Sequence, residues 1–179
     1  MTLTKYKAKR NLKKSGEPKG VIKKEGSAVG NLGVLRFVIH KHHASHLHYD
    51  LRLEINGVLK SWAVPKQPPT TKGVKRLAIE VEDHPLNYAT FEGTIPEGNY
   101  GAGKVEIWDN GDFELIENTA PLGVPQKFEL RGKIEFKLKG KKMKGTFVLI
   151  KLLNKSRTRP SKKPNETKYA KNSWLFFKV

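Results

Sequence analysis

A strictly alternating segment in the first half of the chain constrains its fold more than any other feature. Between residues 46 and 55, polar side chains alternate with apolar ones at every position. The polar set consists of His46, His48, Asp50, Arg52 and Glu54, and the apolar set of Leu47, Tyr49, Leu51, Leu53 and Ile55. Because successive side chains of a β-strand point to opposite faces, the segment predicts a strand with an apolar back and a polar front.

The histidines of the chain gather at the same place, five of the six lying between residues 40 and 48. We expect His42 to end one strand, and a turn over residues 43–46 to bring it opposite His48 and Asp50. Two imidazoles and a carboxylate can hold Mn²⁺, Zn²⁺ or Fe²⁺ and leave positions open to water or substrate. Arg52 indicates a substrate with phosphate or carboxylate oxygens, which a guanidinium binds in pairs. The alternative is a hairpin whose histidines only hydrogen-bond to their neighbours.

Length and composition are compatible with one domain and a sizeable core, since the chain has 179 residues of which 37% are hydrophobic. No apolar run is long enough for a membrane span, and no signal-peptide pattern opens the sequence. Because cysteine is absent, any metal must take nitrogen and oxygen ligands. We expect a cytoplasmic protein that is a monomer and has no membrane partner.

The formal charge of +18 is concentrated in the two flanks. Residues 1–30 carry nine Lys/Arg and two Asp/Glu, for +7, and residues 121–179 carry seventeen and three, for +14. Residues 31–120 carry nine and twelve, for −3. Phosphate backbones attract clustered positive charge, so nucleic acid is the expected partner. A lysine-rich surface that only aids solubility is the alternative.

Short strand-like runs separated by turn signals follow one another from residue 34 onward. The expected strands span 34–42, 46–55, 58–64, 76–82, 104–108, 113–117, 133–139, 145–153 and 174–178. Asn56-Gly57 and Asn110-Gly111 are strong hairpin signals, because both residue types accept positive φ. Many short strands at close spacing favour an antiparallel barrel or sandwich.

The fold we predict is mainly β, an antiparallel β-barrel with short flanking helices and an N-terminal arm. The basic arm comprises residues 1–30 and the barrel domain residues 31–179. The segment 157–172, which is rich in Lys and Arg, is expected to be a loop before the last strand.

The segment 76–84 repeats the pattern of an apolar back and a charged front. One face of the expected strand would carry the apolar residues Leu77, Ile79 and Val81. The other would carry the polar residues Arg76, Glu80, Glu82 and His84. If the two polar fronts meet in one groove, Arg76 and His84 would contact a phosphate. Otherwise the segment is a solvent-facing strand edge.

Longer stretches around these residues resemble one known family, the 3′-phosphoesterase domain of bacterial DNA ligase D and its free-standing archaeal and bacterial versions. The similarity runs through four motifs, at residues 37–54, 59–66, 75–88 and 91–103. They read FVIHKHHASHLHYDLRLE, LKSWAVPK, KRLAIEVEDHPLNY and FEGTIPEGNYGAG. The resemblance is close over residues 5–117 and looser over the basic remainder.

The resemblance implies a Mn²⁺-dependent enzyme, with Zn²⁺ or Co²⁺ as other metals, that heals DNA 3′ ends during double-strand break repair. It would remove a 3′-terminal ribonucleoside and then hydrolyse the 3′-phosphate to the 3′-OH that a polymerase or ligase needs. Its substrates would be DNA 3′ ends and primer-templates, and a separate DNA ligase and polymerase are its expected partners.

The resemblance also implies roles for individual residues. The metal ligands would be His42, His48 and Asp50. The residues around the scissile phosphate would be Arg52, Lys66, Arg76, His84 and Tyr88. Glu82 would support the site, and His40 would belong to the catalytic group. Arg10, Asn11 and Glu17 of the arm would serve the diester step.

Two of these positions differ from the family's usual pattern. His40 stands where the family usually has Gln, and a histidine's charge depends on pH. Asn11 stands where it usually has Asp, and the missing carboxylate predicts weaker diesterase activity.

Other functions use parts of the same pattern. An iron-dependent oxygenase would use the same two-His-one-carboxylate set, and a non-catalytic DNA-binding module would explain the basic flanks. The sequence also leaves open whether His84 is a general acid or only a phosphate ligand.

Overall fold

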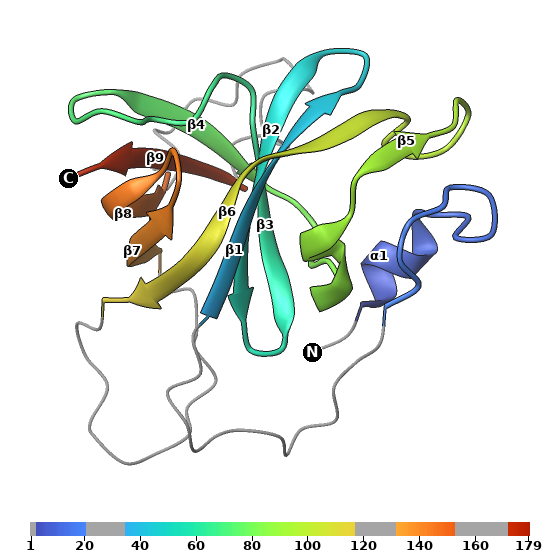
Figure 1. Cartoon of the computed structure of the whole chain (residues 1–179), viewed down its shortest axis with the longest axis horizontal. Helices are drawn as coiled ribbons and strands as arrows, with labels where there is room; N and C mark the ends of the chain where they lie inside the picture. The colour runs from blue at the N-terminus through green and yellow to red at the C-terminus, as the bar shows by residue number, and fades with distance from the viewer. Residues whose placement is uncertain (1–2, 21–34, 117–131, 153–171) are drawn as a thin grey trace, which may run out of the picture.

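The chain folds mainly into β-strands, as predicted, and the computed structural model describes residues 3–20, 35–116, 132–152 and 172–179. Two short helices accompany the strands, α1 (Thr4–Ala8) and the 3₁₀ helix η1 (Leu86–Thr90). The strands are β1 (Leu35–His43), β2 (Leu47–Ile55), β3 (Val58–Val64), β4 (Lys75–Glu80), β5 (Gly93–Ile95), β6 (Gly103–Leu115), β7 (Lys133–Gly140), β8 (Lys144–Lys151) and β9 (Ser173–Lys178) (Figure 1).

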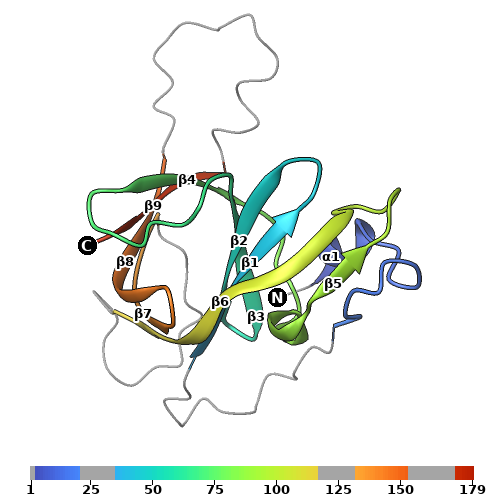
Figure 2. The ribbon, with the colours of Figure 1, turned by 45° about the horizontal axis from the view of Figure 1, so that its top comes forward.

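The strands close into the antiparallel barrel that the sequence predicted. Hydrogen-bonded neighbours follow the order β1-β2-β3-β4-β9-β8-β7-β6, and β6 pairs back onto β1. β5 adds to the free side of β6, outside this closed ring. Figure 2 shows β6 running from β7 at one end of the barrel to β5 at the other. Closure gives each ring strand a paired neighbour on both sides over at least part of its length.

The barrel interior holds the apolar back of β2. Leu51 and Leu53 are fully buried there, together with Phe37 and Ile39 of β1. Aromatic rings complete the packing, with Trp62 from the neighbouring β3 and, from β7–β9, Phe136, Phe147, Trp174 and Phe176. Full burial of each large apolar side chain contributes about 1.5–3 kcal/mol. The predicted alternation of β2 is therefore confirmed.

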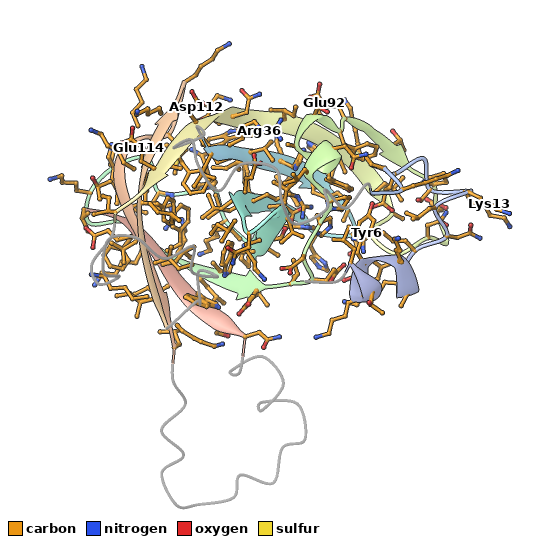
Figure 3. The ribbon with its side chains drawn as sticks, turned by 90° about the horizontal axis from the view of Figure 1, so that it is seen from below. Tyr6, Lys13, Arg36, Glu92, Asp112 and Glu114 are labelled. Atoms are coloured by element: carbon orange, nitrogen blue, oxygen red, sulfur yellow. The ribbon has the colours of Figure 1, made fainter. Side chains whose placement is uncertain are left out.

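The outer face of β1–β3 is covered by a second, smaller layer. Leu3 and Tyr6 of the arm pack with Leu86 and Tyr88 of η1 against the outward side chains of the barrel wall. The Tyr6 hydroxyl donates a hydrogen bond to the Pro18 carbonyl oxygen at 2.8 Å, which ties the two ends of the described arm together. Figure 3 shows Tyr6 on the barrel side of the arm, with Lys13 pointing away. The middle of the polar front of β2, at Asp50 and Arg52, is consequently buried.

One of the two predicted hairpin turns is wrong. Asn56 and Gly57 form the turn between β2 and β3, with φ of 53° and 76°. Asn110 and Gly111 instead lie inside β6, which is one strand where two were expected. At Gly111, β6 pairs with both β1 and β7, and a Cβ there would lie 2.6 Å from the Lys139 carbonyl oxygen. This glycine permits a close approach of strands and makes no turn.

The predicted faces of the segment 76–84 are also wrong in part. Leu77 is 46% exposed, whereas Ala78 is fully buried in the barrel interior. Ala78 pairs with Trp174, whose indole fills the space beside it, so a methyl group suffices at this position. Glu80 shares the inward parity but accepts a hydrogen bond from the Trp174 indole nitrogen at 2.9 Å. β4 ends at Glu80, two residues earlier than expected.

Among the described residues, no helix has the length and apolar composition that a membrane crossing requires. The expected basic loop 157–172 lies outside the described residues except for its last position.

Candidate metal and phosphate site

The three expected metal ligands come together on the outer face of the β1–β2 hairpin. His42 pairs with His48 across the hairpin, and His40 pairs with Asp50. His42 Nδ1 lies 3.7 Å from Asp50 Oδ2, and His48 Nε2 lies 3.8 Å from Asp50 Oδ1. One ligand atom from each of the three residues lies within 4.8 Å of the others. These separations suit three ligands of a single ion.

Backbone carbonyls fix which imidazole nitrogen each histidine presents. His42 Nε2 lies 3.0 Å from the Gly101 carbonyl oxygen, and His48 Nδ1 lies 2.9 Å from the His46 carbonyl oxygen. A carbonyl can only accept, so these nitrogens carry the protons. The lone pairs are left on His42 Nδ1 and His48 Nε2, which are the nitrogens that face Asp50. Such outer hydrogen bonds are typical of metal-binding histidines.

Arg52 extends the same polar front and is buried. Its Nη2 donates to Asp50 Oδ2 at 3.1 Å, its Nη1 to Ser61 Oγ at 2.9 Å, and its Nε to His40 Nδ1 at 3.3 Å. The guanidinium also lies over the Tyr88 ring, 4.7 Å from its centroid. Burial alone would raise the pKa of Asp50, but the charge of Arg52 and the nearby imidazoles outweigh it and hold that pKa below its usual range. Asp50 is therefore a carboxylate, as a metal ligand must be.

His40 lies behind Arg52, fully buried and in edge contact with Tyr88. Burial, reinforced by the charge of Arg52, lowers the pKa of His40 to about 3. The residue is thus neutral at any physiological pH, contrary to the expectation of a pH-dependent charge. Its Nδ1 accepts from Arg52, and the Phe91 backbone lies near enough to interact with the ring.

His84 is buried beside Arg52 and is also held neutral. Burial, followed by the charges of Arg52 and Arg10, lowers the pKa of His84 well below its usual value. Its Nδ1 lies 2.9 Å from the Glu82 carbonyl oxygen and 3.2 Å from Ser61 Oγ, so this nitrogen carries the proton. Its Nε2 faces Arg10 Nη2 at 3.0 Å and accepts from it.

The arm reaches this site through Arg10. Arg10 Nη1 lies 2.7 Å from Glu82 Oε1, and Arg10 Nε lies 2.8 Å from Glu17 Oε1. Both carboxylates are buried. Tyr88 donates its hydroxyl to Glu17 Oε1 at 3.1 Å, whereas Glu17 Oε2 has no partner within the described part of the chain. Lys9 Nζ also lies 2.9 Å from Glu82 Oε2, so two cations of the arm bind one buried acid of the barrel domain.

A cavity of about 190 Å³ lies where these groups meet. Its lining includes most of the expected site, namely Arg10, Glu17, His42, His48, Asp50, Arg52, Glu82, His84 and Tyr88. The wall therefore offers two buried guanidiniums and the metal-ligand set to whatever enters.

Four expected site residues do not line this cavity, and one of them, His40, lies behind Arg52 as described above. Lys66 is exposed just after β3, and Asn11 is exposed on the arm, where its carbonyl oxygen accepts from Lys14 and Ser15. Arg76 lies on β4 and donates to the carbonyl oxygens of Gln67 and Lys75. The expected convergence of Arg76 with His84 at one phosphate is not seen.

Other residues join the site without having been expected there. Ser61 is buried directly opposite Arg52 on β3 and links it to His84. Gly101 orients His42 through its backbone, and Tyr100 lines the cavity beside Lys9 and Arg10. A carbonyl group leaves no signal in a sequence, but Ser61 could have been found from the hairpin register.

A family model described as the DNA Ligase D 3′-phosphoesterase domain matches residues 40–151, which contain the whole metal-ligand set. The chain belongs to the DNA ligase D 3′-phosphoesterase domain family. Its relatives include the multifunctional non-homologous end joining protein LigD of Pseudomonas aeruginosa, at 47% identity over 149 residues. The LigD proteins of Mycolicibacterium smegmatis and Mycobacterium tuberculosis are 44% and 45% identical over 154 and 152 residues.

The alignments cover 83%, 86% and 83% of this chain but only 16%, 20% and 18% of the three LigD relatives. The 3′-phosphoesterase domain is thus one part of those longer proteins. The family match confirms the resemblance that the four sequence motifs indicated.

Proposed function

We propose that this protein is a metal-dependent phosphoesterase that heals DNA 3′ ends. It removes a 3′-terminal ribonucleoside and then the remaining 3′-phosphate, which leaves a 3′-OH for ligation. The observation that carries the proposal is the shared cavity, in which an open metal-ligand set lies beside a buried arginine. The family membership adds the reaction class.

The residues fit a divalent metal such as Mn²⁺, Zn²⁺ or Co²⁺. His42 and His48 present their lone pairs toward Asp50, and the hydrogen bonds that fix them need no rearrangement when an ion binds. We infer Mn²⁺ as the working metal. When bound, it would polarise a phosphate oxygen as a Lewis acid and help orient the substrate.

Arg52 is the phosphate-binding group in this proposal. A guanidinium has five N–H groups, and three are directed to Asp50, Ser61 and His40. One N–H on each of Nη1 and Nη2 is left for the substrate, which suits two oxygens of one phosphate. The three protein contacts hold the guanidinium in place before the substrate arrives, so its charge can stabilise the transition state at little cost of reorganisation.

His84 and Tyr88 act through their neighbours. A general acid at neutral pH must carry a proton to give, but burial and two guanidiniums disfavour the protonated form of His84. We infer that neutral His84 positions Arg10, whose Nη2 donates to its Nε2, and does not itself bind the phosphate. Tyr88 directs its hydroxyl to Glu17 and supports Arg52 with its ring face.

The rival functions account for less of the site. An iron oxygenase would not need a buried arginine held by three side chains beside the ligands, although its ligand set is the same. A non-catalytic DNA-binding module would not need imidazoles whose free nitrogens converge on a carboxylate.

We also propose that the protein works in end joining, since the LigD relatives are named as multifunctional non-homologous end joining proteins. The healed 3′-OH would then pass to a ligase and a polymerase. DNA 3′ ends and primer-templates ending in a ribonucleotide or a phosphate are its proposed substrates.

Adjacent histidines give a matched pair of variants for testing this function. His42 faces Asp50 in the cavity, whereas His43 lies on the opposite face, 42% exposed and 3.3 Å from Glu106. His42→Ala should abolish phosphate release from a 3′-phosphate primer and lower Mn²⁺ affinity, and His43→Ala should change neither by more than about twofold. Activity in His42→Ala equal to that of the wild type would disprove the assigned metal site.

A further inference from the structure

A second, open hollow adjoins the cavity at the tip of the β1–β2 hairpin. This groove, of about 760 Å³, is lined by Ser45, His46, Leu47, His48, Ala63 and Pro65. It shares His48 and Ala63 with the cavity, and none of the arm residues that line the cavity line the groove. The metal ligand His48 thus forms part of the wall between the two spaces.

The groove has the chemistry of a surface that receives an uncharged, partly apolar group. Leu47 is 47% exposed, although it shares the parity of Leu51 and Leu53 in the core, because it lies at the hairpin tip beyond the barrel interior. His46 beside it is exposed and offers a flat ring. No carboxylate is among the six lining residues, so nothing there repels a polyanion.

The cavity and the groove differ in volume, and so in the size of the group that each can hold. Sites for small organic ligands usually measure roughly 300–1,000 Å³, a range that includes the groove and excludes the cavity. A 3′-phosphate is covalently attached to the terminal nucleoside. If the cavity takes the phosphate, the nucleoside must lie in an adjoining space.

We propose that the groove binds the 3′-terminal nucleoside of the DNA strand, with its base against Leu47 and His46, while its phosphate occupies the cavity. The inference rests on the proposed function and adds to it the part of the protein that contacts the terminal nucleoside of the DNA. Apolar and aromatic side chains contact bases without regard to sequence, as an enzyme acting on any 3′ end requires. His48 donates to the His46 carbonyl oxygen, so the groove wall is fixed relative to the metal ligand.

Two leucines of equal exposure provide the test. Leu47 and Leu77 are 47% and 46% exposed, and Leu77 lies on β4 and lines neither space. Steady-state phosphate release is measured with Mn²⁺ for wild type, Leu47→Ala and Leu77→Ala. The substrates are a 3′-phosphate primer and the same primer with an abasic terminal nucleotide. Mn²⁺ affinity of each variant checks that His48 is undisturbed.

The proposal predicts that Leu47→Ala raises KM for the normal primer about fivefold at nearly unchanged kcat, as expected from losing part of one leucine's apolar contact. Leu77→Ala should match the wild type. The abasic terminus should raise the KM of the wild type by at least this factor, because it removes the contacts of the base with both Leu47 and His46. In Leu47→Ala the abasic terminus should raise KM by a smaller factor than in the wild type, because the contact with Leu47 is already lost. Equal KM values for Leu47→Ala and Leu77→Ala would overturn the subsite. So would an increase in the KM of Leu47→Ala for the abasic primer that equals the product of the two separate increases. Either result would leave the proposed function intact. Failure of the wild type to release phosphate from the normal primer would instead reject the proposed function, and the subsite with it.

Discussion

Arg52 is a buried charged residue, and in the proposed function it binds the phosphate of the substrate. We predict that Arg52→Ala lowers kcat for phosphate release by about 10²–10³-fold, as does the loss of other preorganised charge-stabilising groups. Mn²⁺ should still bind, with its affinity lowered by about tenfold at most, because Arg52 supplies no ligand atom and only donates to Asp50. Arg52→Lys should rescue little, since an ammonium cannot reproduce the planar fork. Calorimetric Mn²⁺ titration beside kinetics separates the two effects, and parallel loss of metal and activity would contradict this role.

His40 makes a prediction about stability and pH. Its folded pKa of about 3 lies below the unfolded value of about 6.5, so the unfolded chain takes up this proton first as pH falls. Stability from this residue is complete above pH 6.5 and declines below it. Wild type should therefore lose about 2 kcal/mol more than His40→Gln between pH 7 and pH 5. Urea unfolding in the presence of a chelator measures this, and identical pH slopes would refute a neutral, buried His40.

Among individual residues, the sequence predicted the metal ligands and Arg52 better than the residues that surround them. Parity alone placed His48, Asp50 and Arg52 on one face. The Asn56-Gly57 turn also sets the register that pairs Arg52 with Ser61, so a stricter use of that turn would have found Ser61. Gly101 could not be found, because its contribution is a carbonyl brought in by a loop far along the chain.

At the scale of elements, the arm depends on one buried ion-pair network. Arg10→Ala would leave Glu17 and Glu82 buried without their guanidinium partner, and we predict a loss of roughly 3 kcal/mol in the free energy of unfolding. Lys13→Ala, an exposed change on the same arm, should alter stability by less than about 0.5 kcal/mol. Urea denaturation of both variants tests this, and similar stabilities would mean that the arm is held by its apolar contacts and by Lys9, which lies 2.9 Å from Glu82 Oε2.

The arm also predicts a difference between the two reactions. Deleting residues 1–30 should impair removal of a terminal ribonucleoside more than removal of a 3′-phosphate. The deletion also strips Leu3 and Tyr6 from the layer over β1–β3, so both rates must be compared at a temperature where the variant remains folded. Asn11 is exposed and outside the cavity lining, and Asn11→Asp should raise the diesterase rate if a carboxylate is needed there. Equal loss of both reactions on deletion would assign the arm to folding only.

Elements that depend on the residues of one short segment could be predicted from the sequence. Elements that depend on how distant strands pair in the barrel could not. The Asn-Gly signal held at residues 56–57, where two strands simply reverse. It failed at residues 110–111, because there the dipeptide lies in a continuous strand, and its glycine pairs with β1 on one edge and β7 on the other. β5 and η1 are too short to carry a periodic pattern, so neither was located in advance.

For the whole molecule, the charge distribution predicts how DNA is bound. Basic flanks of +7 and +14 surround a centre of −3, so we assign the flanks to the DNA backbone and the cavity to the 3′ terminus. Log affinity should fall linearly with log salt, by about 0.9 per phosphate contacted on duplex DNA. Replacing Lys162, Lys163 and Lys168, which lie outside the described residues, should make that slope shallower at unchanged kcat. An unchanged slope in this triple variant would leave the segment only a role in solubility.

The central claim is that one metal, held by His42, His48 and Asp50, enables release of a DNA 3′-phosphate. The most direct test strips the protein with a chelator and restores Mn²⁺ in steps, with bound metal and phosphate release measured on the same samples. We predict no release from the stripped protein and a rate that rises in proportion to the filling of a single site. Full activity in the stripped protein, or a rate of phosphate release that does not change with metal occupancy, would contradict the account.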